Sequence, residues 1–221
     1  MGPEATVDFM SKVLDATPAK TDQEHIRMLV DCNPQVPCRV KAILENGPSS
    51  GVVMAKMAKN LEAWGADLLV IPCNTAHYYL DDVQAAVALP VIDMIGETAR
   101  VLFENGVRRA VLLATSALVK TGLYAQKMAA KGIDILLPDS SLQAKVMDII
   151  FAVKAKEHDK ARAGLQEVLS FFENQGVDSA ILACTELPLA AKGLSTGMKL
   201  KLYDPGEILA QEAVKRALAE S

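Results

Sequence analysis

The chain has 221 residues, of which 51% are hydrophobic and 23% charged, and its formal net charge is −4. This is the composition of an ordinary globular protein, and the absence of a dense Lys and Arg run disfavours a nucleic-acid partner. No apolar stretch approaches the ~18 residues of a membrane span, and the N-terminus lacks the basic and apolar regions of a signal peptide.

Short β-rich segments alternate along the chain with longer helical patterns. Strands are expected near residues 26–31, 67–73, 90–94, 109–115, 133–138, 179–184 and 200–204. Helices are expected over residues 39–45, 50–64, 81–87, 96–105, 142–153, 160–175 and 206–219. Continuous apolar runs such as 68–71 and 110–114 are typical of parallel strands buried on both faces. The alternation therefore predicts an α/β fold with parallel sheets.

One pattern occurs twice in the sequence. Gly65-Ala66-Asp67 precedes an apolar run that ends at Cys73-Asn74-Thr75, and Gly176-Val177-Asp178 precedes a run that ends at Cys184-Thr185-Glu186. A weaker repeat relates residues 89–93 to 200–204. These repeats predict two related lobes, the first formed by residues 1–94 and completed by 206–221, the second by residues 95–205.

The four cysteines are Cys32, Cys38, Cys73 and Cys184, and they form neither a Cys-x-x-Cys pair nor a zinc-finger spacing. A core of this size needs no disulfide, so the prediction is a reducing, cytoplasmic setting with no metal site. Cys32 and Cys38 have no matching partners in the repeat. We interpret them as packing or surface thiols.

Cys73 and Cys184 each lie where an apolar strand gives way to a polar turn, the end of a parallel strand where ligands bind. Thr75 and Thr185 are candidate caps of the helices that follow, and helix N-terminal amides stabilise thiolates and bind carboxylates. A single buried cysteine is usually a small hydrophobe. Two matched cysteines facing each other across one cleft would instead supply the base and the acid that racemisation at an α-carbon requires.

At these residues the chain resembles the aspartate/glutamate racemase family, most closely its aspartate racemase branch. The resemblance covers nearly the whole chain. It rests on Met1-Gly2-Pro3-Glu4-Ala5-Thr6, Pro34-x-x-Pro37-x-Arg39, Pro72-Cys73-Asn74-Thr75-Ala76-His77, Ala114-Thr115 with Gly122-x-Tyr124, Val153-Lys154, and Cys184-Thr185-Glu186-Leu187. It implies two pseudo-symmetric Rossmann-like lobes with parallel sheets, an active site in the inter-lobe cleft, no pyridoxal phosphate, no metal, and a homodimer.

The resemblance also implies roles for individual residues. Cys73 and Cys184 would be the acid/base pair, and Asn74, Thr75 and Thr185 would hold the α-carboxylate and the amino group. Arg39 and Lys154 would lie near the side-chain carboxylate of the substrate, and Met1 would belong to a loop that lines the cleft.

The residues themselves leave alternatives open at four positions. Arg39 could simply be a surface residue. Lys154 could be a cation that stabilises the end of its helix. His77 is expected either to tune the Cys73 thiol or to cap and pack. Glu186 is expected either to orient its turn or to favour a helix N-terminus.

Three departures from the family pattern are evident. In the family an apolar strand and a Gly-Gly pair precede the Met-Gly-Pro motif, whereas this sequence begins at Met1, so the first strand is expected to be missing. Ala117-Leu118 stands where the family usually has Gly-Thr, which predicts the loss of a polar ligand-facing group. Cys38 stands where an acidic residue is common.

The sequence therefore predicts an isomerase, a pyridoxal-phosphate-independent amino-acid racemase of the aspartate/glutamate type. Its partner would be a small amino-acid substrate, with no nucleic acid and no membrane. One alternative is an isomerase or racemase of another small carboxylic or amino acid on the same fold. Another is a catalytically impaired amino-acid-binding homologue. The dinucleotide-binding Gly-x-Gly-x-x-Gly pattern and the P-loop are both absent from the sequence.

Overall fold

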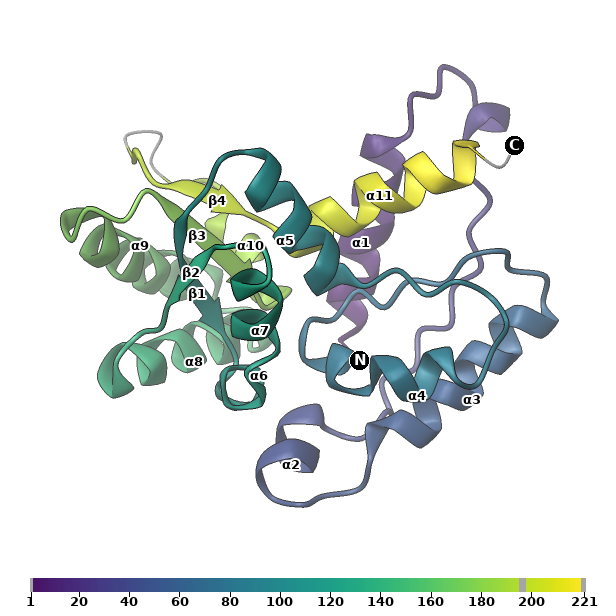
Figure 1. Cartoon of the computed structure of the whole chain (residues 1–221), viewed down its shortest axis with the longest axis horizontal. Coiled ribbons are helices and arrows are strands. Elements are labelled where there is room, and N and C mark those ends of the chain that lie inside the picture. The colour runs from purple at the N-terminus through teal and green to yellow at the C-terminus, as the bar shows by residue number, and fades with distance from the viewer. Residues whose placement is uncertain (1, 195–197, 220–221) are drawn as a thin grey trace. The chain divides into compact units, whose positions relative to one another are not determined.

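The computed structural model describes residues 2–194 and 198–219, which form two compact units (Figure 1). Unit 1 contains the described residues up to Glu97 and from Gly206 onward, and unit 2 runs from Thr98 to Pro205. Within the described residues, no helix is both long enough and apolar enough to cross a membrane.

Unit 2 contains a four-stranded, all-parallel sheet in the order β2-β1-β3-β4. Its strands are β1 (Arg109–Ala114), β2 (Asp134–Leu136), β3 (Ser179–Ala183) and β4 (Lys201–Tyr203). Its helices are α6 (Ser116–Thr121), α7 (Leu123–Ala129), α8 (Ser140–Lys154), α9 (His158–Asn174) and α10 (Glu186–Ala191). The α/β fold with a parallel sheet is therefore confirmed.

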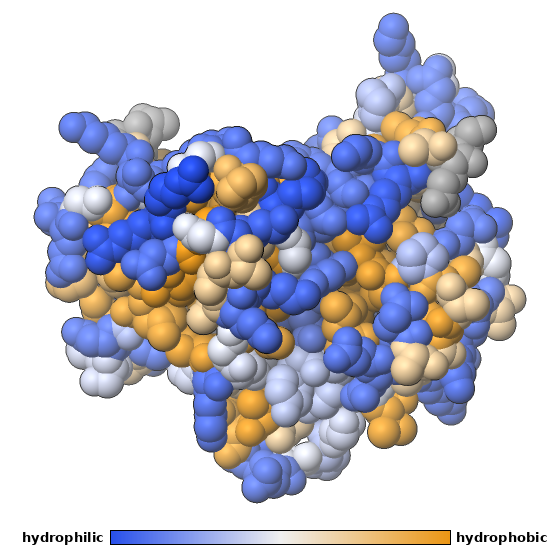
Figure 2. All heavy atoms as spheres, viewed as in Figure 1, coloured by the Kyte–Doolittle hydropathy of each residue, from blue (hydrophilic) through white to orange (hydrophobic). Residues whose placement is uncertain are grey.

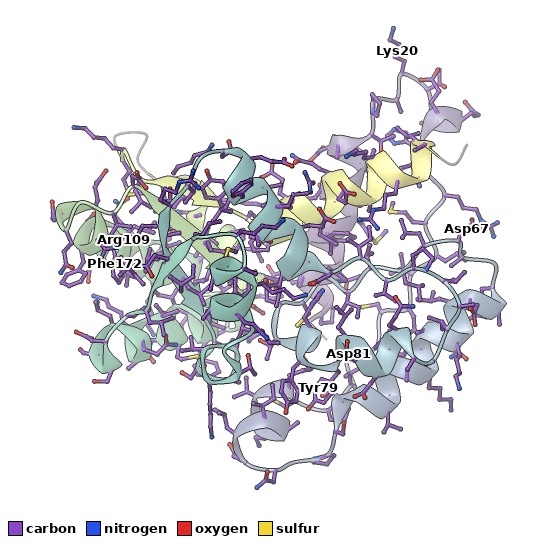
Figure 3. All side chains as sticks on the ribbon, viewed as in Figure 1. Lys20, Asp67, Tyr79, Asp81, Arg109 and Phe172 are labelled. Atoms are coloured by element: carbon purple, nitrogen blue, oxygen red, sulfur yellow. The ribbon has the colours of Figure 1, made fainter. Side chains whose placement is uncertain are left out.

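The two central strands are apolar throughout because both of their faces are covered. Every residue of β3 is buried, as is every residue of β1 after Arg109. Val111 and Leu182 pack with side chains of α8, α9 and α10 in one core, which also includes Phe172, labelled in Figure 3. Figure 1 shows α8 and α9 on one side of the sheet and α7 on the other.

The order of the strands identifies where a ligand would bind in unit 2. The chain leaves β1 through α6 and α7 to reach β2 on one side, and leaves β3 through α10 to reach β4 on the other side. The direction of winding therefore reverses between β1 and β3, and such switch points open a crevice at the carboxyl ends of the strands. Ala114 and Ala183 pair at that edge, so Thr115 and Cys184 follow directly at the switch point.

Unit 1 is built mainly from helices. They are α1 (Pro3–Ala16), η1 (Asp22–Glu24), α2 (Arg39–Leu44), α3 (Ser50–Ala63), η2 (Thr75–Tyr79), α4 (Leu80–Gln84) and α11 (Pro205–Ala219). Helix α5 (Met94–Glu104) begins in unit 1 and ends in unit 2. The sequence patterns did not predict α1 or α6.

The extended segment 68–71 lies between two cores of unit 1. Leu69 and Ile71 are buried in the core that contains α3 and α4, whereas Leu68 and Val70 pack on the core formed by α1 and α11. This alternation is the one that a strand shows when both of its faces are covered. The segment therefore has the side-chain environment of a strand.

The strands expected at residues 26–31, 67–73 and 90–94 are nevertheless wrong. Between them they form only an isolated parallel bridge of Leu69 with Val91, in which the Leu69 N–H donates to the Pro90 carbonyl at 3.0 Å and the Ile92 N–H donates to the Leu69 carbonyl at 3.0 Å. Among the described residues, segment 26–31 makes no backbone–backbone hydrogen bond.

A cavity lies alongside two of these segments. Residues 23–31 and 65–72 line one cavity of about 810 Å³, together with side chains of α1, α3 and α11. Figure 3 labels Asp67 at the start of the second segment, and Figure 2 shows hydrophobic residues on the visible surface of unit 1.

This difference between the units predicts a difference in amide hydrogen exchange. Amides of residues 111–113 and 180–182 should exchange far more slowly than those of 27–30, because only the former are hydrogen-bonded in a buried ladder. Exchange followed by peptide-level mass spectrometry measures both segments in one experiment, with α9 as an internal reference. Equal protection of the two segments would contradict the described unit 1 backbone.

Candidate active site

Cys184 is buried at the point where β3 gives way to α10. The Leu187 N–H donates to the Cys184 carbonyl at 2.9 Å and closes the first turn. Thr185 is the N-cap residue of α10, but its side chain makes no capping hydrogen bond. Its hydroxyl instead donates to Glu186 Oε2 at 3.2 Å, so the expected capping role of the Thr185 side chain is wrong.

Glu186 connects Cys184 to a cation on another helix. The Cys184 thiol donates to Glu186 Oε2 at 2.9 Å. The other carboxylate oxygen, Oε1, forms an ion pair with the Lys154 ammonium at the end of α8. The Glu186 side chain is 10% exposed and the Lys154 side chain 49%. A buried carboxylate thus joins a nucleophilic thiol to a cation that reaches solvent.

The charge state of Glu186 follows from these contacts. Burial by itself would raise the pKa of the Glu186 carboxyl, because a low dielectric disfavours the charged form. The charge of Lys154 and the hydrogen bonds from Cys184 and Lys154 act in the opposite direction and outweigh burial, so the pKa lies below its ordinary value. Glu186 is therefore a carboxylate at neutral pH.

Cys73 occupies the corresponding position in unit 1, directly after the extended segment, and is half-buried. The short helix η2 follows it, with the Ala76 N–H donating to the Cys73 carbonyl at 3.2 Å. Asn74 is the N-cap residue and makes no side-chain cap bond, while Thr75 is the first residue of the helix. The expectation that Thr75 caps this helix is therefore wrong. Both Asn74 and Thr75 are buried.

His77 anchors the backbone of this turn. Its Nδ1 lies 3.0 Å from the Cys73 carbonyl oxygen, and its Nε2 accepts from the Met94 N–H at 3.0 Å. Because the amide can only donate, Nε2 is unprotonated, which leaves Nδ1–H as the donor to the carbonyl. Both ring nitrogens are thus engaged with backbone groups, which supports the packing interpretation of His77.

Arg39 begins α2 and has an unsatisfied donor. Its Nη1 donates to the Pro37 carbonyl at 3.1 Å and to the Val36 carbonyl at 3.5 Å. In the described part of the chain, its Nε is buried and has no hydrogen-bond partner. A buried N–H without an acceptor is costly, and a carboxylate is the natural acceptor for the guanidinium fork.

Residues at the end of β1 form the other side of the switch point. Thr115 caps α6 by accepting from the Leu118 N–H at 3.2 Å. Ala117 and Leu118 are both buried in unit 2, so the residues that replace the family's Gly-Thr pack inside the unit.

Gln143 of α8 lies at the same edge and was not singled out from the sequence. Its Nε2 donates to the Ala114 carbonyl at 3.0 Å and to Ser116 Oγ at 3.2 Å. Its Oε1 is buried and finds no donor among residues 2–194 and 198–219. A glutamine within a helical pattern has no distinctive sequence signal, so only the structure could identify it.

The structure thus places the expected site residues on both units. Arg39, Cys73, Asn74 and Thr75 belong to unit 1, whereas Lys154, Cys184 and Thr185 belong to unit 2. Met1 lies outside the described residues. Cys32 and Cys38 are exposed, free thiols. No group of three or more His, Cys, Asp or Glu side chains gathers as a metal site within the described residues.

Comparison with known proteins shows similarity along the whole chain. A family model described as Asp/Glu/Hydantoin racemase matches residues 1–213. The chain is 26% identical over 223 aligned residues to the broad specificity amino-acid racemase RacX of Bacillus subtilis (strain 168), which covers 99% of this chain and 96% of that protein.

Solved structures show the same similarity. The aspartate racemase of Picrophilus torridus superposes with a TM-score of 0.88 and 34% identity, over 98% of this chain and 90% of that one. An aspartate racemase homologue from Pyrococcus horikoshii OT3 has a TM-score of 0.77 and 26% identity, over 98% of this chain and 95% of that one.

The lowered pKa of Glu186 predicts how its contribution to stability depends on pH. A depressed folded-state pKa stabilises the fold above the ordinary value of 4.5, and this contribution is lost as the pH falls through the folded pKa. The stability difference between the wild type and Glu186→Gln should therefore be constant near neutral pH and should change in favour of the variant below about pH 4.5. Denaturant unfolding across this range measures it.

The exposed Lys145–Glu167 ion pair of α8 and α9 provides a matched control. The stability difference between the wild type and Glu167→Gln should change little with pH, because solvent screens an exposed pair. If the stability difference from the wild type changed with pH equally in both variants, Glu186 would not be specially stabilised as a carboxylate.

Proposed function

Because the chain belongs to the Asp/Glu/hydantoin racemase family and is an amino-acid racemase, an isomerase, we propose that it interconverts the L- and D-enantiomers of an acidic amino acid. Aspartate is the first candidate substrate. The similarity to the Picrophilus torridus aspartate racemase over 98% of this chain supports this choice.

We propose that Cys73 and Cys184 perform the reaction as a two-base pair. One cysteine, as a thiolate, removes the α-proton from one face of the substrate, and the other, as a thiol, donates its proton to the opposite face. One C–H bond breaks and another forms, so the pair has one proton before and one after turnover. The observation that supports this most is the repeat, because each cysteine directly follows the same Gly-x-Asp-apolar segment in its own unit.

The substrate-binding roles follow from unsatisfied or buried polar groups. The orphan Nε of Arg39 favours binding of the side-chain carboxylate. Asn74, Thr75 and Thr185 are proposed to bind the α-carboxylate and the amino group. Oε1 of Gln143 is a buried acceptor suited to the substrate ammonium.

Lys154 is proposed to lie near the substrate carboxylate, because its half-exposed side chain carries a cation at the end of α8. The role of Met1 in lining the cleft stays a prediction. The protein is also proposed to work without pyridoxal phosphate or metal, as a homodimer in the reducing cytoplasm, where its four free thiols would stay reduced.

A second candidate function is racemisation of a wider set of amino acids. The similarity to a broad specificity amino-acid racemase over 96% of that protein favours it. The two candidates differ in whether activity depends on a side-chain carboxylate. Activity across an amino-acid panel therefore separates them.

Replacing either cysteine should abolish racemisation. We expect Cys73→Ser and Cys184→Ser each to lower the rate by roughly 10²–10⁴-fold, because a hydroxyl is a far weaker base than a thiolate. The assay is loss of the α-proton signal in D₂O by NMR together with chiral chromatography, run without pyridoxal phosphate and with a chelator. Cys32→Ser and Cys38→Ser should keep full activity, and full activity in either of the first two variants would refute the two-base proposal.

Arg39 should determine selectivity for acidic substrates. Arg39→Met should raise KM for aspartate by at least roughly tenfold, because loss of a buried charge partner costs about 2 kcal/mol or more. The effect on an uncharged amino acid should be small. Arg108→Met, which removes a guanidinium that lies over the Phe103 ring in unit 2, is the matched control. An equal loss for charged and uncharged substrates would exclude Arg39 from carboxylate recognition.

A further inference from the structure

The two cysteines occupy equivalent positions in the repeat but have different neighbours. Two residues after Cys73 the chain has Thr75, whereas two residues after Cys184 it has Glu186. Glu186 accepts the hydrogen bond of the Cys184 thiol at 2.9 Å. On the other side, the nearby titratable group is His77, and both of its ring nitrogens are engaged with the backbone. The sequence repeat thus contains a chemical asymmetry.

We propose that Glu186, held as a carboxylate by Lys154, is a positioning residue that keeps Cys184 the protonated member of the cysteine pair in the resting enzyme. The proposal rests on the two-cysteine function proposed above and deepens it. It assigns Cys184 as the proton donor of the resting state and leaves Cys73 as the base.

The hydrogen bond itself requires this protonation state. An ionised carboxylate can only accept, so a thiol that contacts it at 2.9 Å must supply the proton. A thiolate at the same distance would put two negative charges together at a buried position, which low dielectric makes costly. The Lys154 ammonium contacts the other oxygen, Oε1, and its charge favours the ionised carboxylate.

Several charged groups on the surrounding elements engage other partners. On α9, Arg162 pairs with Asp159 and donates to the Lys192 carbonyl at the C-terminal end of α10. On β4, Lys201 donates to Asn105 and lies over the Tyr203 ring. Asp204 follows β4, and the uncharged Thr115 follows β1. Glu186 contacts the Cys184 thiol, and Lys154 in turn contacts Glu186.

This arrangement has a consequence during turnover. When Cys184 donates its proton to the substrate carbon, its S–H bond breaks and a thiolate is left beside the Glu186 carboxylate. That enzyme form is disfavoured relative to the resting form, in which the proton is on Cys184. The free enzyme should therefore return to the Cys184 thiol before most turnovers.

Alkylation of Cys184 tests this assignment directly. The folded protein is treated with iodoacetamide at a series of pH values, and modification of each cysteine is followed by mass spectrometry, since only thiolates react. In Glu186→Gln the half-maximal pH for Cys184 should fall by about one unit or more, which is about a tenfold higher rate at pH 7.5. Glu186→Asp, which keeps the charge, should partly restore the wild-type profile.

Two further variants keep the test decisive. Glu167→Gln, which breaks the exposed Lys145 pair between α8 and α9, should leave the Cys184 profile unchanged. If Glu186→Gln does not fold, Lys154→Gln replaces a half-exposed cation and should move the half-maximal pH upward, because the carboxylate is no longer neutralised. An unchanged Cys184 profile in folded Glu186→Gln, or a downward shift in Lys154→Gln, would overturn the proposal.

Activity supplies a second readout that a merely structural role would not move. The alkaline limb of the pH profile of kcat/KM should shift to lower pH in Glu186→Gln, whereas a structural defect would lower activity equally at every pH. Alkylation reports on Cys184 even if no amino acid is racemised. Failure of the Glu186 assignment and failure of the proposed function are therefore distinguishable.

Discussion

Strands β1 and β3 are buried on both faces, and this constraint determines the edge of the sheet at which Thr115 and Cys184 lie. Their register pairs Ala114 with Ala183, so the segments that follow β1 and β3 leave the sheet side by side at its switch point. Polar turns begin at this edge, so the buried Cys184 has polar as well as apolar neighbours. The side chains of Gln143 and Glu186 reach the same edge from helices that cover the sheet.

The buried carboxylate at this edge is that of Glu186, and its contacts determine its charge. A buried charge is tolerated only with a partner and hydrogen bonds, and Glu186 has both through Lys154, Thr185 and Cys184. Truncating Lys154 would leave the charge without its partner. The network connects the Cys184 thiol, through Glu186, to a cation that reaches solvent.

Unit 1 places its cysteine by different means. The segment before Cys73 has the two-sided burial of a strand, but its backbone pairs only at Leu69 and a large cavity lies alongside it. The turn at Cys73 is instead fixed by His77, which joins the Cys73 carbonyl to the Met94 amide. Side-chain packing and one imidazole thus do for Cys73 what a hydrogen-bonded ladder does for Cys184.

The sequence by itself determined the α/β class, the central strands of unit 2 and the repeat that relates Cys73 to Cys184. These features are local, because a continuous apolar run and a strand-end polar turn are visible within a few residues. The tertiary structure alone decided which extended segments form a ladder, since pairing requires a neighbouring backbone that no segment of the sequence specifies. It also decided the roles of Glu186 and His77, because their partners Lys154 and Met94 are 32 and 17 residues away along the chain.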